Sequence, residues 1–338
     1  MKKLRIGAAL LFCAILLTAL ASCGKSYNYD LSEYITLGNY KGVEIAAAEI
    51  DSQVQSQLDS LLEQKATTED IADRPAALGD IVNIDYTGTI GGAAFEGGTA
   101  SAQEVTLGAG GYIDGFEDGI VGMAMGEEKT VTCLFPEDYQ NTELAGKAAD
   151  FAITLHSIKH KTLPELNDEF ILSLENGYDT LDSYKAYLRK AIKENSVWTK
   201  IISEVAVIKY PKKEVKAAYN QMVTYYKSLA AQYNATLDEY IMNYQGSDTN
   251  TFLSHIASYA QEAVKSEMCL YAIARAENIT VSDSDYQTKG AELASAAGFE
   301  DLKAYEKSVG KENIENSILN TLVREWCANQ AVETAAEG

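Results

Sequence analysis

The sequence predicts an α+β protein in which a small antiparallel sheet, wrapped on one short helix, is inserted into an otherwise helical chain. Two observations support this fold class. Residues 78–162 are rich in glycine and alternate apolar with polar residues, the period of half-buried strands, whereas both flanks repeat apolar residues at helical spacing. Pro75 and Pro164 bracket the central block and indicate a linker at each end. We therefore expect four segments, residues 1–22, 23–77, 78–162 and 163–338.

Length and charge limit the classes of function. The chain has 338 residues, of which 46% are apolar, so it can bury a sizeable core and is not a disordered protein. Lys and Arg number 28 against 49 Asp and Glu, which gives a formal net charge of −21. Because phosphate-neutralising basic surface is scarce, nucleic acid, including ribosomal RNA, is not an expected partner.

The N-terminus has the pattern of an export signal. Lys2, Lys3 and Arg5 precede an apolar run at residues 7–21, which is shorter than the roughly 20 residues that span a membrane. The run ends in Leu-Ala-Ser-Cys at positions 20–23, which resembles a bacterial lipoprotein signal, with residues 1–22 as signal peptide and Cys23 as the lipidated residue. The alternative is an ordinary signal peptide with an accidental cysteine. We expect an exported protein, anchored by its N-terminal lipid to the outer face of the bacterial membrane.

The central block carries four strand patterns and one helix pattern. Apolar residues alternate with polar ones at 82–87 and 151–156, and shorter patterns indicate strands at 131–135 and 105–107. Between the last two lies IDGFEDGIVGM at 113–123, which predicts a short helix. A twisted antiparallel sheet packed on that helix is the expected assembly.

The flanks predict long helices. Apolar stripes predict helices at 49–66, 215–233, 252–263 and around 314–322. A run at 180–209 lacks Pro and Gly, with Asp179 or Thr180 as N-cap and Pro211 as the stop. Fourteen of the 21 tyrosines lie beyond residue 163. They could hold unfolded segments loosely, or they are ordinary core and rim residues.

The central block also carries separated motifs in a recognisable order. GDIVNIDYTGTIGGAAFEGG (79–98), VTLGAGGYIDGFEDGIVGMAMGEE (105–128), FPEDY (135–139) and ELAGKAADFAITLHSI (143–158) together resemble the FKBP-type peptidyl-prolyl isomerase domain in its trigger factor version. Residues 31–80 resemble the trigger factor linker, a strand around 42–48 followed by a helix. LPELNDEF (163–170) is similar to the join after the isomerase, and 180–334 resembles the trigger factor C-terminal chaperone domain. The resemblance implies that the linker packs on this helical body as one discontinuous domain.

The resemblance also implies the residues of a prolyl site. Tyr86 faces the pocket from a strand, Phe116 forms its floor and Phe151 closes a wall. The backbone N–H of Ile113 and the hydroxyl of Tyr139 meet the substrate. Phe95 and Glu96 take the positions of an aromatic residue followed by an acid, completing the set Tyr86, Phe95, Glu96, Ile113, Phe116, Tyr139 and Phe151. A further aromatic position of the family is Gln103 here, which is expected to open one wall and weaken activity. The alternative is that these aromatics are only the core of a small domain.

The chemistry of prolyl isomerisation fits such a pocket. The barrier of about 18–20 kcal/mol comes from amide resonance, so no nucleophile, metal or cofactor is required, and none is expected here. An apolar pocket removes the water that stabilises the planar amide, and a few donors hold the carbonyls. Each ~1.4 kcal/mol of preference for the twisted amide gives a tenfold gain in rate.

Other sites are not indicated. Three histidines (His156, His160 and His255) and cysteines without a CxxC pair do not suggest zinc. Cys133, Cys269 and Cys327, the cysteines beyond Cys23, are expected as buried small apolar residues. None of the five arginines follows a Phe, so the Phe-Arg signature of ribosome-binding trigger factors is absent from this sequence, and the ribosome is not an expected partner.

We therefore predict an extracytoplasmic peptidyl-prolyl cis-trans isomerase that is also a chaperone for exported unfolded or Pro-containing polypeptides. The first alternative is a peptide-binding lipoprotein, a holdase with weak or no isomerase activity. Gln103 is the residue that favours this alternative. A second alternative is an adhesive or substrate-binding surface lipoprotein that shares the fold.

Overall fold

The computed structural model describes residues 27–335, and the predicted signal peptide and Cys23 lie outside them. By the density of internal contacts the chain divides into two compact units. Among the described residues, one unit joins 27–54 with 186–335, and the other is Gln55–Lys185. Helices α2 (Ala47–Lys65) and α5 (Leu181–Glu204) each run from one unit into the other.

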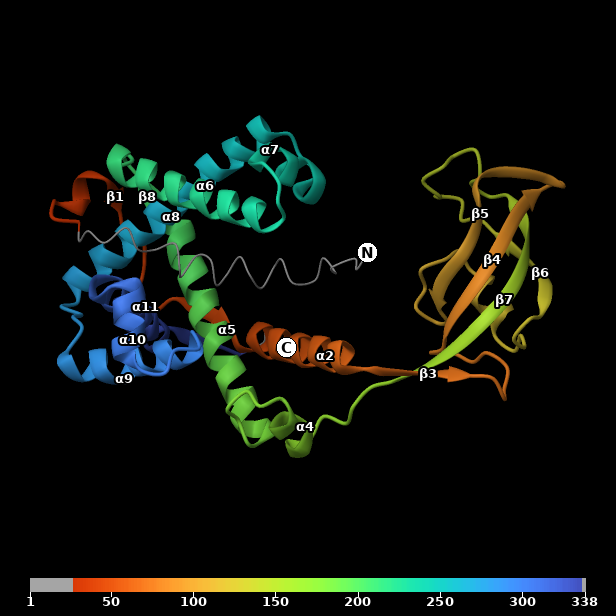
Figure 1. Ribbon diagram of the computed structural model, residues 1–338, viewed down its shortest axis with the longest axis horizontal. Helices are drawn as coiled ribbons and strands as arrows, with labels where there is room; N and C mark the ends of the chain where they lie inside the picture. The colour runs from red at the N-terminus through yellow and green to blue at the C-terminus, as the bar shows by residue number, and fades with distance from the viewer. Residues whose placement is uncertain (1–26, 336–338) are drawn as a thin grey trace. The chain divides into compact units, whose positions relative to one another are not determined.

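The second unit contains the predicted antiparallel sheet (Figure 1). A short helix shares its core, through Phe116 and Ile120. The elements of this unit are β3 (Thr67–Ile71), β4 (Ile81–Ile90), β5 (Ala93–Thr106), α3 (Phe116–Ile120), β6 (Glu128–Leu134), β7 (Ala148–Thr162) and α4 (Asp168–Ser173). The strand order is β3-β7-β4-β5, and all neighbouring strands are antiparallel. Strand β6 also pairs antiparallel with β7, along a different stretch of β7 from the one that pairs with β3.

Strand β7 organises this sheet. Its first half pairs with β6 and its second half with β3 along one edge, while β4 follows the other edge from Ile81↔Lys159 to Thr89↔Asp150. Alternate residues of β4 and β7 are buried, as the period of two predicts. The core between sheet and helix holds Phe116, Ile120, Ile84 and Leu155, each at most 1% exposed.

The first unit is helical. Its remaining elements are a 3-10 turn η2 (Leu31–Glu33), β1 (Ile35–Thr36), β2 (Glu44–Ala46), β8 (Ala206–Val207), α6 (Lys212–Gln232), α7 (Leu237–Tyr240), the π-helical turn η3 (Ile241–Gln245), α8 (Thr249–Ala276), α9 (Asp283–Ala296), α10 (Leu302–Val309), α11 (Lys311–Gln330) and β9 (Val332–Thr334). Helix α8 supplies ten buried residues, including Ile256, Met268 and Ile273, and it forms the centre of the unit.

Two strand pairs join N-terminal segments of this unit to later parts of the chain. Strand β2 pairs with β9 in parallel, from Glu44↔Val332 to Ala46↔Thr334. Strand β1 pairs with β8 in antiparallel register. The predicted strand around 42–48 is therefore present as β2, which pairs with the C-terminal strand β9.

The predicted helix at 180–209 is wrong at its C-terminal end. Thr180 caps α5 through its hydroxyl, which accepts from the Ser183 N–H at 3.2 Å, as the sequence indicated. The helix ends at Glu204 and not near Pro211, because Ala206 and Val207 pair with β1. Pairing with a segment about 170 residues away overrides the local helical pattern.

Within residues 27–335, no helix combines the length and apolar character that crossing a bilayer requires.

Candidate functional site

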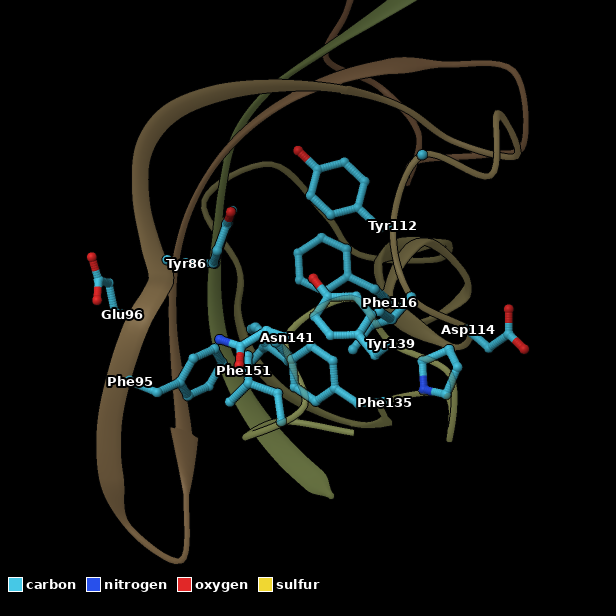
Figure 2. Close-up of a pocket in the computed structure, with 15 residues that line it drawn as sticks. Tyr86, Phe95, Glu96, Tyr112, Asp114, Phe116, Phe135, Tyr139, Asn141 and Phe151 are labelled. Carbon is cyan, nitrogen blue, oxygen red and sulfur yellow. The ribbon is translucent and has the colours of Figure 1, made fainter. Parts of the chain in front are cut away.

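The sheet unit contains a cavity of about 580 Å³ that is lined largely by aromatic residues. Figure 2 shows rings from several segments meeting there. The structure places all seven residues implied by the family resemblance on its lining, and their part in catalysis stays a prediction. The fifteen lining residues are Tyr86, Phe95, Glu96, Gly97, Gly111, Tyr112, Ile113, Asp114, Phe116, Phe135, Pro136, Tyr139, Asn141, Leu144 and Phe151.

The floor is a set of rings packed edge to face. The Phe116 ring lies 5.2 Å from Phe151 and 5.3 Å from Tyr86, between centroids, at 87° and 79°. Phe95 meets Phe151 at 6.1 Å and 86°. Edge-to-face pairs place positive ring edges against negative faces and hold each ring in one orientation. The floor is thus a preorganised apolar surface.

Two glycines let the rings lie against backbone. A Cβ at Gly88 of β4 would come within 2.7 Å of the Phe151 ring, and one at Gly98 of β5 within 2.8 Å of the Phe95 ring. Contacts that short do not occur for real Cβ atoms. The glycine-rich composition of this stretch therefore makes room for the aromatic rings.

A buried carboxylate shapes the loop at one side of the mouth. Glu117 of α3 is 8% exposed, and its Oε2 accepts from the N–H groups of Gly108 at 2.8 Å and Gly110 at 3.1 Å, while Oε1 accepts from Gly111 at 2.9 Å. Gly108 and Gly110 have φ of 89° and 71°, which suits glycine. Burial raises the pKa of Glu117, but the backbone donors outweigh it and the pKa is lowered.

The mouth offers hydrogen-bonding groups to a peptide. Within the described residues the Ile113 N–H has no acceptor, so it is available to a ligand carbonyl. The Tyr139 ring packs on Phe135 with centroids 4.7 Å apart, and Figure 2 shows its hydroxyl among the labelled rings. An apolar floor with donors at the edge can desolvate a prolyl amide and hold its neighbouring carbonyl.

Sequence reasoning missed several lining residues. Tyr112 stacks on Phe116 with centroids 4.7 Å apart and planes at 12°, and it also meets Tyr86 edge-on. Burial raises the pKa of Tyr112, and the neighbouring Gln103 side chain acts in the opposite direction. Gln103 itself does not line the cavity. Tyr112 therefore adds an aromatic ring to the lining, beside Phe116 and close to the Gln103 side chain.

The two histidines of this unit lie within hydrogen-bond distance of aspartates. His156 Nε2 lies 3.0 Å from Asp85, and His160 Nδ1 lies 2.9 Å from fully buried Asp80. The Arg74 guanidinium also binds Asp80, at 2.5 and 2.9 Å, and holds its pKa well below the usual value. Neither histidine lines the cavity.

The cysteines and acidic residues form no further site in the described part of the chain. Cys133, Cys269 and Cys327 are buried free thiols, as predicted, and burial raises the pKa of Cys269 to about 12 and that of Cys327 to about 11. No group of three or more potential ligand side chains among residues 27–335 is arranged to hold a metal ion.

The helical unit exposes a separate aromatic surface. Tyr233, Tyr240 and Tyr244 form a cluster with centroids 4.8 to 5.6 Å apart at the end of α6 and along α7 and η3. Tyr233 and Tyr244 are about half exposed, and the neighbouring Met242 is 63% exposed. Clustered aromatic and methionine side chains offer adaptable apolar contact to a polypeptide. We call these four residues the tyrosine cluster.

Comparison with known proteins defines the class first. Residues 72–156 match the FKBP-type peptidyl-prolyl cis-trans isomerase family, and residues 180–332 match the C-terminus of the bacterial trigger factor protein. Fold, cavity and family match together define a chain that combines an FKBP-type isomerase domain with a trigger factor-type chaperone domain.

The relatives then give the family. The trigger factor of Lachnoclostridium phytofermentans is 34% identical over 304 residues, covering 86% of this chain and 70% of its own length. That of Acetivibrio thermocellus is 33% identical, covering 84% and 70%. The chain belongs to the trigger factor family.

A solved structure described as "Promiscuous Substrate Recognition in Folding and Assembly Activities of the Trigger Factor Chaperone" covers 88% of this chain and 73% of its own. It has 18% identity and a TM-score of 0.36, so the likeness adds nothing to the family assignment.

Proposed function

We propose that the protein is an extracytoplasmic foldase, a peptidyl-prolyl cis-trans isomerase that also holds unfolded exported polypeptides. The observation that carries the isomerase activity is the cavity in which Tyr86, Phe95, Phe116 and Phe151 converge, with the free Ile113 N–H at its edge. In this cavity the rings exclude water from the prolyl amide, and Ile113 and Tyr139 hold the adjoining carbonyls.

The chaperone activity belongs to the helical unit. The tyrosine cluster presents exposed apolar surface that does not depend on the isomerase cavity. Membership of the trigger factor family supports the same assignment.

Export and anchoring form part of the proposal. They rest on the signal-like residues 1–22 and on Cys23, which lie outside the described residues. We further propose that the protein does not work on the ribosome, since no Arg follows a Phe in this sequence.

Refolding of a protein limited by a slow X-Pro isomerisation tests the enzymatic part. Purified residues 24–338 should accelerate the slow phase, which takes roughly tens to hundreds of seconds without a catalyst. No acceleration at catalytic concentration, together with suppression of client aggregation, would identify a holdase instead. Gln103, at a position where the family has an aromatic residue, is the observation that favours this second candidate.

A further inference from the structure

The proposed lipid lies close to the helical unit along the chain. Cys23 precedes Tyr27, the first described residue, by four residues, which span at most roughly 14 Å when fully extended. A lipid on Cys23 therefore holds Tyr27 within about that distance of the membrane surface. It follows that the part of the helical unit around Tyr27 lies near the lipid headgroups.

Tyr27 is fixed in the helical unit. It is 2% exposed, and its hydroxyl donates to Glu267 of α8 at 2.7 Å. The guanidinium of Arg275, in the last turn of α8, donates to the backbone carbonyl of Tyr29 at 2.9 Å and also to that of Tyr27. Because the tether before this fixed point is only four residues long, it limits which face of the unit can lie against the membrane.

A series of ring contacts leads from Tyr27 to the start of α6. The Tyr27 ring meets Tyr29 at 5.6 Å, and Tyr29 meets Tyr34 at 4.8 Å, between centroids. Lys209 Nζ lies 4.4 Å from the centroid of the Tyr34 ring, and the Lys209 N–H donates to the Tyr34 carbonyl at 3.3 Å. Burial raises the pKa of Tyr29, and the nearby Glu214 carboxylate of α6 raises it further. The beginning of α6 therefore lies beside the end of the tether.

This part of the surface is basic in a strongly acidic chain. Residues 209–216 contain four Lys and one Glu, whereas the whole chain has 28 Lys and Arg against 49 Asp and Glu. Lys212, Lys213 and Lys216 are exposed and make no ion pair within residues 27–335. Lys212 and Lys213 fall in the first turn of α6, where positive charge is unfavourable for the helix. These lysines therefore do not serve to stabilise α6.

The neighbouring groups suit the surface of a bilayer. Two acids of the N-terminal segment are engaged, since Glu33 pairs with Lys209 at 3.0 Å and Asp30 accepts from the Ser32 N–H at 2.9 Å. Ile208, next to Lys209, is 59% exposed. An apolar side chain beside lysines can enter the headgroup region while the ammonium groups meet lipid phosphates.

We propose that the face formed by Ile208, Lys209, Lys212, Lys213 and Lys216, the basic face, docks on an anionic bilayer and so orients the helical unit on the membrane. The proposal rests on the proposed lipid anchor and adds the surface that the anchored protein turns to the headgroups. The tether makes this contact intramolecular, so a few lysines are enough. The same bilayer repels the acidic remainder of the chain, which favours this one orientation.

Lysine footprinting on vesicles tests the proposal. Residues 23–338 are coupled through the Cys23 thiol to a maleimide lipid. The other cysteines of this chain are buried and do not compete for the lipid; they are Cys133, Cys269 and Cys327. The acetylation rate of each lysine is then measured by mass spectrometry in solution, on phosphatidylcholine vesicles, and on vesicles of equal parts phosphatidylcholine and phosphatidylglycerol.

On the anionic vesicles we expect Lys212, Lys213 and Lys216 to react about fivefold more slowly than in solution, the preference of one Lys for an anionic surface. The protection should largely vanish at 1 M salt, where charges are screened beyond about 3 Å.

Three exposed lysines outside the basic face are internal controls and should react at unchanged rates. They are Lys227, Lys303 and Lys307, which make no ion pair in the described part of the chain. Lys227 lies about 16 Å further along α6 than Lys216. The other two belong to α10, which packs on α9 and α11.

A pair of matched variants separates the basic face from net charge. The variant that removes three charges from the face is Lys212→Gln/Lys213→Gln/Lys216→Gln. The control that removes three charges elsewhere is Lys227→Gln/Lys303→Gln/Lys307→Gln. Lys209, which remains in both, should lose its protection on anionic vesicles in the first variant and keep it in the control.

The outcomes separate docking from anchoring. Equal rates in solution and on anionic vesicles would overturn the proposal, as would equal protection on pure phosphatidylcholine, which would assign the contact to the tether alone. The same protection by inorganic phosphate in solution would identify a small-anion site and overturn membrane docking. A mature chain from cells that lacks the mass of a diacylglycerol would overturn the lipid anchor, and docking with it, whatever the vesicles show.

Discussion

The Glu117 side chain holds the loop at one side of the cavity mouth. Its carboxylate accepts three backbone N–H groups of the loop that carries Ile113. Glu117→Gln replaces one oxygen by an NH₂ group that faces donors. We expect it to lower the free energy of unfolding by about 1.5–3 kcal/mol, the value of hydrogen bonds to a charged group. Isomerase kcat/KM should fall as well.

Urea unfolding and peptide isomerisation of Glu117→Gln check this. The control is Asp118→Asn, an exposed neighbour in the same helix turn. Equal stability of the two variants would show that the Glu117 hydrogen bonds do not hold the loop.

Glu267 gives the helical unit a dependence on pH. Burial raises its pKa from 4.5 to about 7, with Glu214 adding to the shift, although the Tyr27 hydroxyl donates to it at 2.7 Å. Because the folded pKa exceeds the unfolded one, the contribution of this group is fully present below pH ~4.5 and is lost as pH rises to ~7. The loss is of the order of 3 kcal/mol.

Glu267→Gln should therefore unfold with a smaller difference in free energy between pH 5 and pH 8 than the wild type. Urea unfolding at the two pH values measures it, with Glu262→Gln, an exposed glutamate on the same helix, as control. A pH difference unchanged from wild type in Glu267→Gln would refute the assignment to this carboxyl.

At the scale of elements, the isomerase block begins and ends at neighbouring points. Thr67 at the start of β3 pairs with Thr162 at the end of β7. Paired residues of adjacent antiparallel strands have Cα atoms about 4.5–5.5 Å apart. The sheet can therefore be inserted into the chain without spreading the flanking helices.

Removal of the block should leave a working chaperone. Residues 24–66, joined by a short Gly-Ser linker to 163–338, should fold as a helical unit, because the β1–β8 and β2–β9 pairs and the α8 core are retained. The truncated chain should suppress aggregation of a client nearly as well as the full chain, as measured by light scattering. A helical circular-dichroism spectrum without any suppression would place holding activity in the deleted block.

Elements with strong local periodicity could be predicted from the sequence, and those defined by distant pairing could not. The alternation of apolar and polar residues predicted β4 and β7, and the apolar stripes predicted α6, α8 and α11. Strand β3, TTEDI, was missed because four of its five residues are exposed and only its pairing with β7 makes it a strand. The end of α5 was wrong for the same kind of reason, the β1–β8 pair.

Some residues of the candidate site could likewise be predicted from the sequence, and others could not. The seven candidate residues came from ordered motifs, and the structure brings them to one cavity. Tyr112 was missed because a loop residue has no periodicity that indicates its orientation, and Glu117 because a helix acid ordinarily faces solvent. The expected effect of Gln103 on activity stays a prediction, and Tyr112 adds a ring beside Phe116 that the sequence did not indicate.

For the molecule as a whole, the proposal of membrane anchoring depends on one atom, the Cys23 thiol. Cys23→Ser cannot accept the lipid, so the variant should be released from membranes or accumulate as unprocessed precursor. Fractionation and the mass of the mature chain measure both. A variant that is still processed and still sediments with membranes would argue against the lipid anchor.

The central claim is that the aromatic cavity isomerises prolyl bonds while the helical unit holds clients. The direct measurement is peptide isomerisation by NMR exchange and aggregation suppression on the same folded samples of wild type, Phe116→Ala and Tyr139→Phe. We predict that Tyr139→Phe costs about 0.5–1.5 kcal/mol, or up to roughly tenfold in kcat/KM. Phe116→Ala should cost more, because removing a buried ring costs about 3–5 kcal/mol in a packed core. Both variants should keep aggregation suppression. Unchanged isomerisation in folded Phe116→Ala, or none in the wild type, would contradict the account.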